Sequence, residues 1–155
     1  MRDLLYLSRR HARGGIRMGF MTIKPENCAG CKACELSCSL KHYGYFDCTK
    51  SRIRILRDGE RWSVAIHQCI QCDQKFCIAA CPTGSLSLDL SLGFIRYDAT
   101  LCISCKKCFK ACPHHGVQWD EEHGQPLICD LCGGDPECLK PCRLHRALTH
   151  NSKEA

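Results

Sequence analysis

The stretch CISCKKCFKACP at residues 102–113 contains four cysteines separated by two, two and three residues, and it ends on a proline. CAGCKACELSC at residues 28–38 repeats the same gaps. Two variants keep the order but lengthen the middle gap, to four residues in CIQCDQKFCIAACP at 69–82 and to five in CDLCGGDPECLKPC at 129–142. Sixteen of the 17 cysteines therefore fall into four groups, and only Cys48 is left over.

The spacing within each group has a chemical reason. Three thiolates must reach three corners of one iron–sulfur cube, and two-residue gaps let a tight loop wrap the cube with its backbone N–H groups toward the sulfurs. The last two cysteines of each group lie one helical turn apart, so they project from one face of a short helix but are offset along its axis. In two-cluster ferredoxins the fourth cysteine ligates the other cluster. The pattern therefore favours four [4Fe–4S] clusters held by groups that work in pairs.

Two other uses of dense cysteine are weaker. Zinc also takes four thiolates, but it predicts paired Cys-x2-Cys motifs, whereas here three cysteines plus a helical fourth recur in all four groups. Disulfides are not favoured, because the number of cysteines is odd and because the N-terminal residues lack the apolar segment of a secretory signal. No run of 18 apolar residues occurs, so no membrane insertion is expected. We therefore expect a cytoplasmic protein with reduced thiols that bind metal.

The composition leaves little material for a hydrophobic core. Cysteine makes up 11% of the 155 residues, while Leu, Ile, Val and Phe together provide 33 residues, or 21%. A chain of this size needs a larger apolar interior to offset its conformational entropy. Metal bound to the cysteines is therefore expected to supply much of the stability.

Short hairpins are expected between the cysteine groups. Asp58-Gly59 is a strong turn signal between two alternating segments, and the Cys-Pro turn, hairpin and cysteine loop recur in order as an internal repeat. A helix is possible over residues 139–148. The pattern predicts a small, loop-rich α+β fold with short helices and hairpins over residues 52–56 with 62–66, 85–90 with 94–97, and 116–119 with 125–128.

Over residues 22–145 the four groups resemble the sixteen-cysteine ferredoxin-like electron-transfer subunits, of the DMSO reductase iron–sulfur subunit type, which accompany molybdenum or tungsten oxidoreductases, membrane-linked hydrogenases and carbon monoxide dehydrogenases. The resemblance implies two pseudo-symmetric dicluster modules of the bacterial ferredoxin type. Groups one and four form one module, and residues 65–118 form the other. Residues 1–21 are then a basic N-terminal arm and residues 146–155 a C-terminal tail.

The resemblance also implies the ligands of each cluster, three from one group and the fourth from its partner group. The sets are Cys28, Cys31, Cys34 and Cys142 for cluster 1; Cys129, Cys132, Cys138 and Cys38 for cluster 2; Cys69, Cys72, Cys77 and Cys112 for cluster 3; and Cys102, Cys105, Cys108 and Cys81 for cluster 4. The chain departs from the family where Arg143 replaces a frequent proline and where residues 73–76 replace a proline-bearing spacer. Neither departure removes a ligand. Cys48 is interpreted as a small buried hydrophobe.

No nucleophile-and-base constellation or phosphate loop occurs, so we expect a non-catalytic subunit that relays single electrons between a catalytic oxidoreductase subunit and a second redox protein. The short chain is similar to the small iron–sulfur subunits of tungsten aldehyde oxidoreductases, which makes a tungsten or molybdenum enzyme the first choice of partner. The alternative is a ferredoxin-like subunit of a hydrogenase, formate or carbon monoxide dehydrogenase system. From other classes come a zinc-stabilised basic binding module and a cluster-bearing enzyme.

The formal charge of +6 does not predict nucleic-acid binding. Four oxidised clusters with their thiolates carry about −8, which brings the loaded chain to about −2. No nucleic-acid motif accompanies the basic residues. Lys32, Lys106, Lys107 and Lys110 lie beside cysteines and would favour reduced clusters. Three interpretations of the arginine-rich arm remain open. It is a solvated tail, or it results from a start codon placed upstream of the true start at Met18 or Met21, or it contacts a partner subunit.

Overall fold

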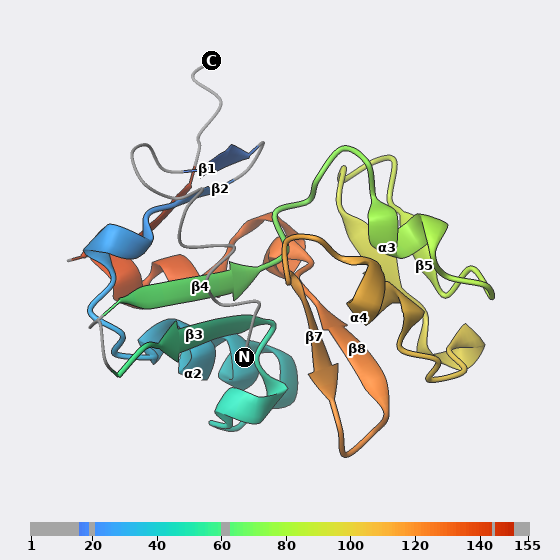
Figure 1. Cartoon of the computed structure of the whole chain (residues 1–155), viewed down its shortest axis with the longest axis horizontal. Helices are drawn as coiled ribbons and strands as arrows, with labels where there is room; N and C mark the ends of the chain where they lie inside the picture. The colour runs from blue at the N-terminus through green and yellow to red at the C-terminus, as the bar shows by residue number, and fades with distance from the viewer. Residues whose placement is uncertain (1–15, 19–20, 60–62, 144, 151–155) are drawn as a thin grey trace.

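The computed structural model of the chain (Figure 1) describes residues 16–18, 21–59, 63–143 and 145–150. The elements are short, as expected for a small, loop-rich α+β fold. The strands are β1 (Ile16–Met18), β2 (Met21–Ile23), β3 (Ile53–Arg57), β4 (Val64–Gln68), β5 (Leu86–Leu88), β6 (Ile95–Tyr97), β7 (Val117–Asp120), β8 (Gln125–Ile128) and β9 (Leu148–His150). The α-helices are α2 (Ala33–Tyr43), α3 (Phe76–Ala79) and α4 (Lys107–Ala111). The 3-10 helices are η1 (Pro25–Asn27), η2 (Cys48–Lys50), η3 (Ala99–Leu101), η4 (Leu131–Gly134), η5 (Glu137–Leu139) and η6 (Pro141–Arg143).

The three predicted hairpins are present as antiparallel pairs: β3 with β4, β5 with β6, and β7 with β8. Residue 62 of the first hairpin lies outside the described residues. In β3 the side chains of Ile53 and Ile55 are 1% and 3% exposed, whereas Arg54 between them reaches back to the carbonyl of Thr49 at 2.7 Å. This alternation places the apolar face of the hairpin on the core, and it fixes the register because a one-residue slip would expose both isoleucines.

A sheet of three strands joins the two ends of the described chain. β2 is the central strand, with β1 on one side and β9 on the other, both antiparallel. Part of the predicted arm, residues 16–18, and part of the predicted tail, residues 148–150, thus belong to this sheet. The rest of the arm lies outside the described residues. Ala147 and Leu148 are 1% and 3% exposed, so the C-terminal segment packs into the core instead of ending as a tail at residue 146.

The helix expected over residues 139–148 does not form. The segment consists of the end of η5, the 3-10 turn η6 and then β9. Pro141 lies in the segment and starts η6. A proline lacks the N–H that an α-helix needs in its interior and disfavours helical backbone in the residue before it, so a continuous helix cannot run through this position.

The elements pack into two lobes, which Figure 1 separates at left and right. The 1/4 lobe contains groups one and four, because α2 packs against β3, η5 and η6, and β9 packs against η5 and η6. The 2/3 lobe contains groups two and three, because α3 packs against α4 and β5, and α4 packs against β7. Cysteine groups one and four therefore pack together in one lobe, and groups two and three pack together in the other.

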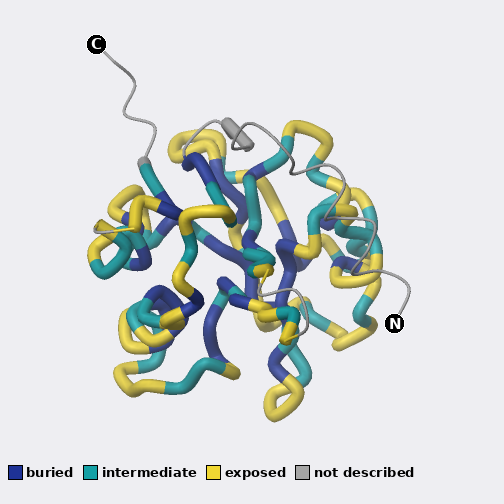
Figure 2. Tube along the Cα trace, turned by 60° about the vertical axis from the view of Figure 1, so that its left-hand side comes forward, coloured by how far each residue is buried: buried dark blue, intermediate teal, exposed yellow. Residues whose placement is uncertain are grey.

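Each lobe has its own small core, and cysteines contribute to both. Figure 2 shows the buried part of the trace inside the molecule and exposed residues at the loop tips. The core of the 1/4 lobe combines four cysteines with Met21, Ile23, Ile53, Ile55, Phe94, Leu131 and Leu148. The core of the 2/3 lobe combines Cys77 and Cys108 with Leu86, Ile95, Val117 and Ile128. Cysteine thiols and apolar side chains therefore share both cores.

Polar groups connect the lobes. Lys50, 3% exposed at the end of η2, donates to the Asp120 carboxylate at 2.8 Å at the end of β7. Gln71 donates to the carbonyl of Cys129 at 2.6 Å and accepts from the backbone N–H of Ile95 at 3.1 Å. These bonds satisfy buried polar groups at the junction and hold the two lobes in one arrangement.

Candidate metal centres

All four cysteine loops contain the same backbone feature. The residue before the second cysteine has a left-handed conformation: φ is +65° at Gly30, +53° at Gln71, +56° at Ser104 and +54° at Leu131. For the three residues other than glycine this conformation costs roughly 1–2 kcal/mol each. Successive N–H groups around such a residue converge on one point and form an anion-binding concavity. Its recurrence at the same position in four loops indicates a shared ligand.

Further left-handed residues follow in all four loops. In groups one to three the residue is the N-cap of the helix that carries the third cysteine: Lys32 before α2, Lys75 before α3 and Lys106 before α4. The fourth cysteine lies in the same helix only in group one, whereas Cys81 and Cys112 follow the ends of α3 and α4. In group four the left-handed residues are Cys132, Gly133 and Gly134. In group four the loop is longer, and η5 with its N-cap Pro136 replaces the α-helix. The sequence variant with the five-residue gap therefore has its own backbone path, although its first turn keeps the common geometry.

Backbone N–H groups point at cysteine sulfurs, as expected for sulfurs that carry negative charge. Such bonds favour the thiolate form that binds metal. The donors and acceptors are Gly30 to Cys28 at 3.3 Å, Arg52 to Cys38 at 3.4 Å, and Gly116 to Cys112 at 3.3 Å.

Three cavities are each lined by four cysteines, three from one group and one from its partner group. The first is lined by Cys28, Cys31, Cys34 and Cys142, the second by Cys38, Cys129, Cys132 and Cys138, and the third by Cys81, Cys102, Cys105 and Cys108. Two cysteine pairs that are one helical turn apart, Cys34 with Cys38 and Cys138 with Cys142, are thus divided between the first two cavities. The structure brings these twelve thiols together in the combinations that the family resemblance implies.

The remaining four cysteines, Cys69, Cys72, Cys77 and Cys112, lie near one another in the 2/3 lobe. Burial, and in addition the nearby Cys77 and Cys112 thiolates, raises the pKa of Cys69. Burial together with Cys112 and Cys72 raises the pKa of Cys77. These effects link the four thiols that the family resemblance assigns to cluster 3.

Burial makes the bare thiols reluctant to ionise. It raises the pKa of Cys34 to about 12, that of Cys129 to about 12 and that of Cys108 to about 11. Without a cation these thiols stay protonated at neutral pH, and binding of metal must release their protons. Iron provides the positive charge that a buried group of four thiolates requires.

The four sets form a series. In three places the thiolate of one set raises the pKa of a thiol in the next set, in addition to the larger effect of burial. The neighbours are Cys34 with Cys138, Cys129 with Cys69, and Cys77 with Cys108. The order along the molecule is therefore cluster set 1, 2, 3 and 4, with the step between sets 2 and 3 crossing from one lobe to the other.

Exposure separates the ends of the series from its middle. Of the sixteen cysteines in the sets, all of which are described, only Cys31 and Cys105 are exposed. Cys31 belongs to the first set and Cys105 to the last. The thiols of the two inner sets are buried or half-buried, so a partner protein can approach the series most closely at its two ends.

The structure adds polar residues that motif analysis did not identify. His42 approaches Cys132 at 3.8 Å, and Gln68 donates to Cys129 at 3.7 Å. His42 follows Cys38 by one helical turn, which is the spacing that could have indicated it. Cys48 is half-buried and lines none of the three cavities. Burial and the Glu35 carboxylate raise the pKa of its thiol.

The donor sets fit [4Fe–4S] cubes. Each set is complete with four sulfurs, which is the Cys₄ ligation that such a cluster takes.

Lys106 beside the last set forms an ion pair with Glu121 at 2.9 Å and lies 5.0 Å from the centre of the Trp119 ring. In the described part of the chain, no helix combines the length and apolar character that crossing a bilayer requires.

Comparison with known proteins agrees with this donor chemistry. The 4Fe-4S dicluster domain family matches residues 60–152, and the 4Fe-4S binding domain family matches residues 25–44. The polyferredoxin-like subunit of aliphatic sulfonate oxidoreductase from Pyrococcus furiosus is 39% identical over 123 residues, which cover 79% of this chain and 70% of the relative. The B subunit of anaerobic dimethyl sulfoxide reductase from Haemophilus influenzae is 33% identical, over 79% of this chain and 68% of the relative.

A longer relative and a solved structure extend the comparison. The beta subunit of NADH-dependent phenylglyoxylate dehydrogenase from Aromatoleum evansii is 37% identical over 81% of this chain but only 28% of its own length. The active site complex BamBC of benzoyl coenzyme A reductase, in complex with zinc, contains a chain that is 27% identical with a TM-score of 0.50, covering 88% of this chain and 80% of that chain. The protein therefore belongs to the 4Fe-4S dicluster family and is an iron–sulfur electron-transfer subunit of oxidoreductase complexes.

Proposed function

We propose that four [4Fe–4S] clusters are held by the four thiol sets, and that the chain relays single electrons between a catalytic oxidoreductase subunit and a second redox protein. The observation that carries this proposal is the lining of three cavities by three thiols of one group and the fourth thiol of its partner group. Composition alone does not produce that combination, because the cysteines of each cavity come from segments far apart in the sequence.

The residues of the chain hold, space and shield the clusters. When bound, the clusters supply one-electron transfer, and full ligation by four sulfurs leaves no open position for a substrate. The N–H groups of Gly30, Arg52 and Gly116 stabilise the thiolates. The two lobe cores exclude water from the inner sets, and the junction keeps Cys69 of one lobe near Cys129 of the other. We therefore propose that the chain is non-catalytic and transfers electrons between its two ends.

The exposed sulfurs mark the ends at which partners dock. Around Cys105 lie Leu101, Ile103 and Phe109, whose exposed fractions are 47%, 62% and 44%. Around Cys31 lie the exposed Lys32 and the Arg57 guanidinium, which donates to the carbonyl of Ala29 at 2.6 Å. Exposed apolar side chains beside an exposed redox ligand suit the buried centre of a protein interface.

We take the catalytic partner to be a tungsten or molybdenum oxidoreductase, with an aldehyde oxidoreductase as first choice. The relatives support a catalytic partner of the oxidoreductase class, since they are subunits of sulfonate oxidoreductase and dimethyl sulfoxide reductase. The choice of metal rests on the resemblance of this short chain to the small subunits of tungsten enzymes.

Metal analysis tests the cluster assignment. Chain purified without oxygen should contain about sixteen iron and sixteen sulfide, as four cubes require. Cys105→Ala should lower both by about four or fewer, since three ligands remain for that cube. Cys48→Ala is the matched control, because Cys48 lines none of the cavities, and it should leave both unchanged. Zinc without sulfide in the native chain would refute the proposal.

A separate experiment tests the partner. Affinity-tagged chain, isolated without oxygen from its native host, should recover a larger catalytic subunit that contains tungsten or molybdenum by mass spectrometry of the metals. A recovered catalytic subunit with neither metal would refute this choice of partner and leave the cluster assignment intact.

A further inference from the structure

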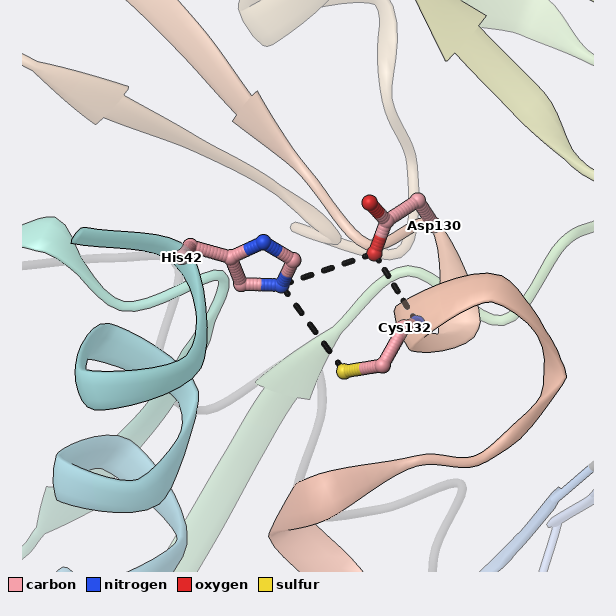
Figure 3. Close-up of side chains that lie close together, drawn as sticks. All are labelled: His42, Asp130 and Cys132. Carbon is pink, nitrogen blue, oxygen red and sulfur yellow. Dashed lines mark hydrogen bonds and ion pairs between the residues drawn. The ribbon is translucent and has the colours of Figure 1, made fainter. Parts of the chain in front are cut away.

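A charged side-chain network lies against the second thiol set. His42 comes from the last turn of α2, Asp130 and Cys132 come from the group-four loop, and Figure 3 shows their side chains converging. His42 Nε2 is 3.8 Å from the Cys132 sulfur and 3.5 Å from Asp130 Oδ1. Asp130 Oδ1 also accepts from the backbone N–H of Cys132 at 3.0 Å. The Asp130 carboxylate is therefore bonded to the backbone of Cys132, and His42 lies between this carboxylate and the Cys132 sulfur.

Arg52 completes the network and contacts a second ligand of the same set. Its guanidinium Nη1 lies 2.6 Å from Asp130 Oδ2 and 2.9 Å from His42 Nε2. Its backbone N–H donates to the sulfur of Cys38 at 3.4 Å. Arg52 thus touches Cys38 of group one directly and reaches the group-four loop through Asp130, so both signs of charge are fixed beside the same four sulfurs.

These charges are better shielded from water than the ion pair beside the last set. The side chains of His42, Arg52 and Asp130 are 12%, 21% and 37% exposed. At the last set, the Lys106–Glu121 pair has exposed fractions of 40% and 78%. Solvent and salt screen exposed charges strongly and buried ones much less. The charges of Arg52 and Asp130 therefore act on the second set more strongly than surface charges act on the others.

We propose that Arg52 and Asp130 are positioning residues that set the reduction potential of the cluster held by Cys38, Cys129, Cys132 and Cys138. The inference rests on the proposed function. Reduction transfers one electron from the reductant to the bound cluster and makes the site more negative, with no bond formed or broken. Arg52 favours the reduced form, Asp130 disfavours it, and the ion pair fixes the balance between them. His42 fills the space between the guanidinium, the carboxylate and the sulfur.

Opposite effects of two variants test the proposal in the full chain with its clusters. Arg52→Gln leaves Asp130 unpaired, so the equilibrium constant for one-electron reduction of one cluster should fall at least about tenfold, or 59 mV. Asp130→Asn keeps an oxygen that can accept from Cys132 N–H but leaves Arg52 unpaired, so the same cluster should become at least about tenfold easier to reduce. Redox titration followed by electron paramagnetic resonance should show the other clusters unchanged.

Two further variants separate charge from shape. Arg52→Lys retains the positive charge and should lie closer to the native potential than Arg52→Gln. The double variant Arg52→Gln/Asp130→Asn removes both charges and should return toward the native value. Arg96→Gln and Asp89→Asn are matched controls, since they remove the same charges from a pair 3.5 Å apart in which Arg96 is 70% exposed. Both controls should leave every potential unchanged.

Iron content distinguishes the two levels of the proposal. Native chain without about sixteen iron would refute the proposed function. Variants that keep the native iron content but show unchanged potentials, or shifts of the opposite sign, would overturn the role of Arg52 and Asp130. If Arg52→Gln loses iron, the isosteric Asp130→Asn decides the question. Loss of iron in both single variants would also overturn the proposal, because the pair would then be structural.

Discussion

The two lobes hold the same kind of thiol set in different surroundings. The 1/4 lobe has the eleven-residue helix α2, a three-stranded sheet and a core to which seven residues other than cysteine contribute. The 2/3 lobe has helices of four and five residues, and four residues other than cysteine in its core. The same cysteine loop can therefore be supported mainly by protein packing or mainly by the metal that it binds.

The lobes also differ in the charged groups close to their sulfurs. The 1/4 lobe keeps charged and polar groups such as Glu35 and Arg52 close to its sulfurs, with Glu35 only 1% exposed. Large apolar side chains are exposed on both lobes, among them Phe46 at 67% on the 1/4 lobe and Ile103 at 62% on the 2/3 lobe. Ile103 is two residues from the exposed Cys105, so in the 2/3 lobe exposed apolar surface lies beside an exposed sulfur.

Removing the iron should have the largest effect and should separate the lobes. After chelation, the β5–β6 hairpin and α4 should exchange their amide hydrogens within seconds, because four apolar residues cannot offset the conformational entropy of that lobe. The β3–β4 hairpin, which carries Ile53 and Ile55, should keep measurable protection. Hydrogen exchange read by mass spectrometry measures both. Equal loss of protection in the two hairpins would contradict the comparison.

Breaking the lobe junction should have the next largest effect. Lys50→Met removes the ammonium that pairs with Asp120, whose side chain is 2% exposed, and leaves that buried carboxylate with the His123 ring nitrogen at 2.8 Å as its remaining side-chain partner. The Tm of the iron-loaded chain should fall clearly, and Lys50→Met/Asp120→Asn should recover part of the loss because no charge is then stranded.

Lys140→Met is the control for this junction. It removes a lysine that also forms an ion pair, with Glu137, but whose side chain is 49% exposed. Its effect on Tm should be near zero, as is usual for surface ion pairs. A Lys50→Met chain as stable as the native one would show that the lobes do not depend on this pair.

A methyl group at the contact between β7 and group two should be less costly. A Cβ on Gly116 would lie 2.6 Å from the Cα of Cys69 and 2.8 Å from the carbonyl oxygen of Gln68, both backbone atoms. Gly116→Ala should destabilise the chain by about 1–3 kcal/mol through overpacking, and it should loosen the third thiol set so that iron is lost on mild chelation.

Gly59→Ala provides the matched control, because a Cβ there meets nothing within 4 Å. Its free energy of unfolding should change by less than about 0.5 kcal/mol. Equal effects of the two substitutions in denaturant titrations would show that the close approach at Gly116 is not needed.

The smallest expected effect concerns the apolar surface near Cys105. Leu101→Ser should leave iron content and Tm unchanged, since the side chain is 47% exposed and lines none of the three cavities, but it should weaken the binding of one redox partner about tenfold, or about 1.4 kcal/mol. Leu40→Ser, at a site 43% exposed on α2 in the other lobe, should leave that affinity unchanged. Unchanged affinity for both partners after Leu101→Ser would contradict the assignment of this end as a docking surface.

Local features were predictable because their signals are local. The alternation in residues 53–56 and the Asp58-Gly59 turn indicated the β3–β4 hairpin, which the structure contains. The helix expected over residues 139–148 is absent, because Pro141 lies inside that segment and disfavours a continuous helix. The predicted tail at residue 146 was wrong in part for a different reason. Pairing of β9 with β2 spans most of the chain, and no local pattern encodes such a partner.

Cysteine spacing by itself determined that the chain binds iron–sulfur clusters, because the loop that wraps a cube needs its thiols at short, fixed intervals. Only the tertiary structure decided what surrounds each set. Cys132 and His42 are 90 residues apart in the sequence, and Arg52 reaches both groups from a third segment. Electrostatic effects depend on distance and on exposure to water, and both arise only when separate segments pack together.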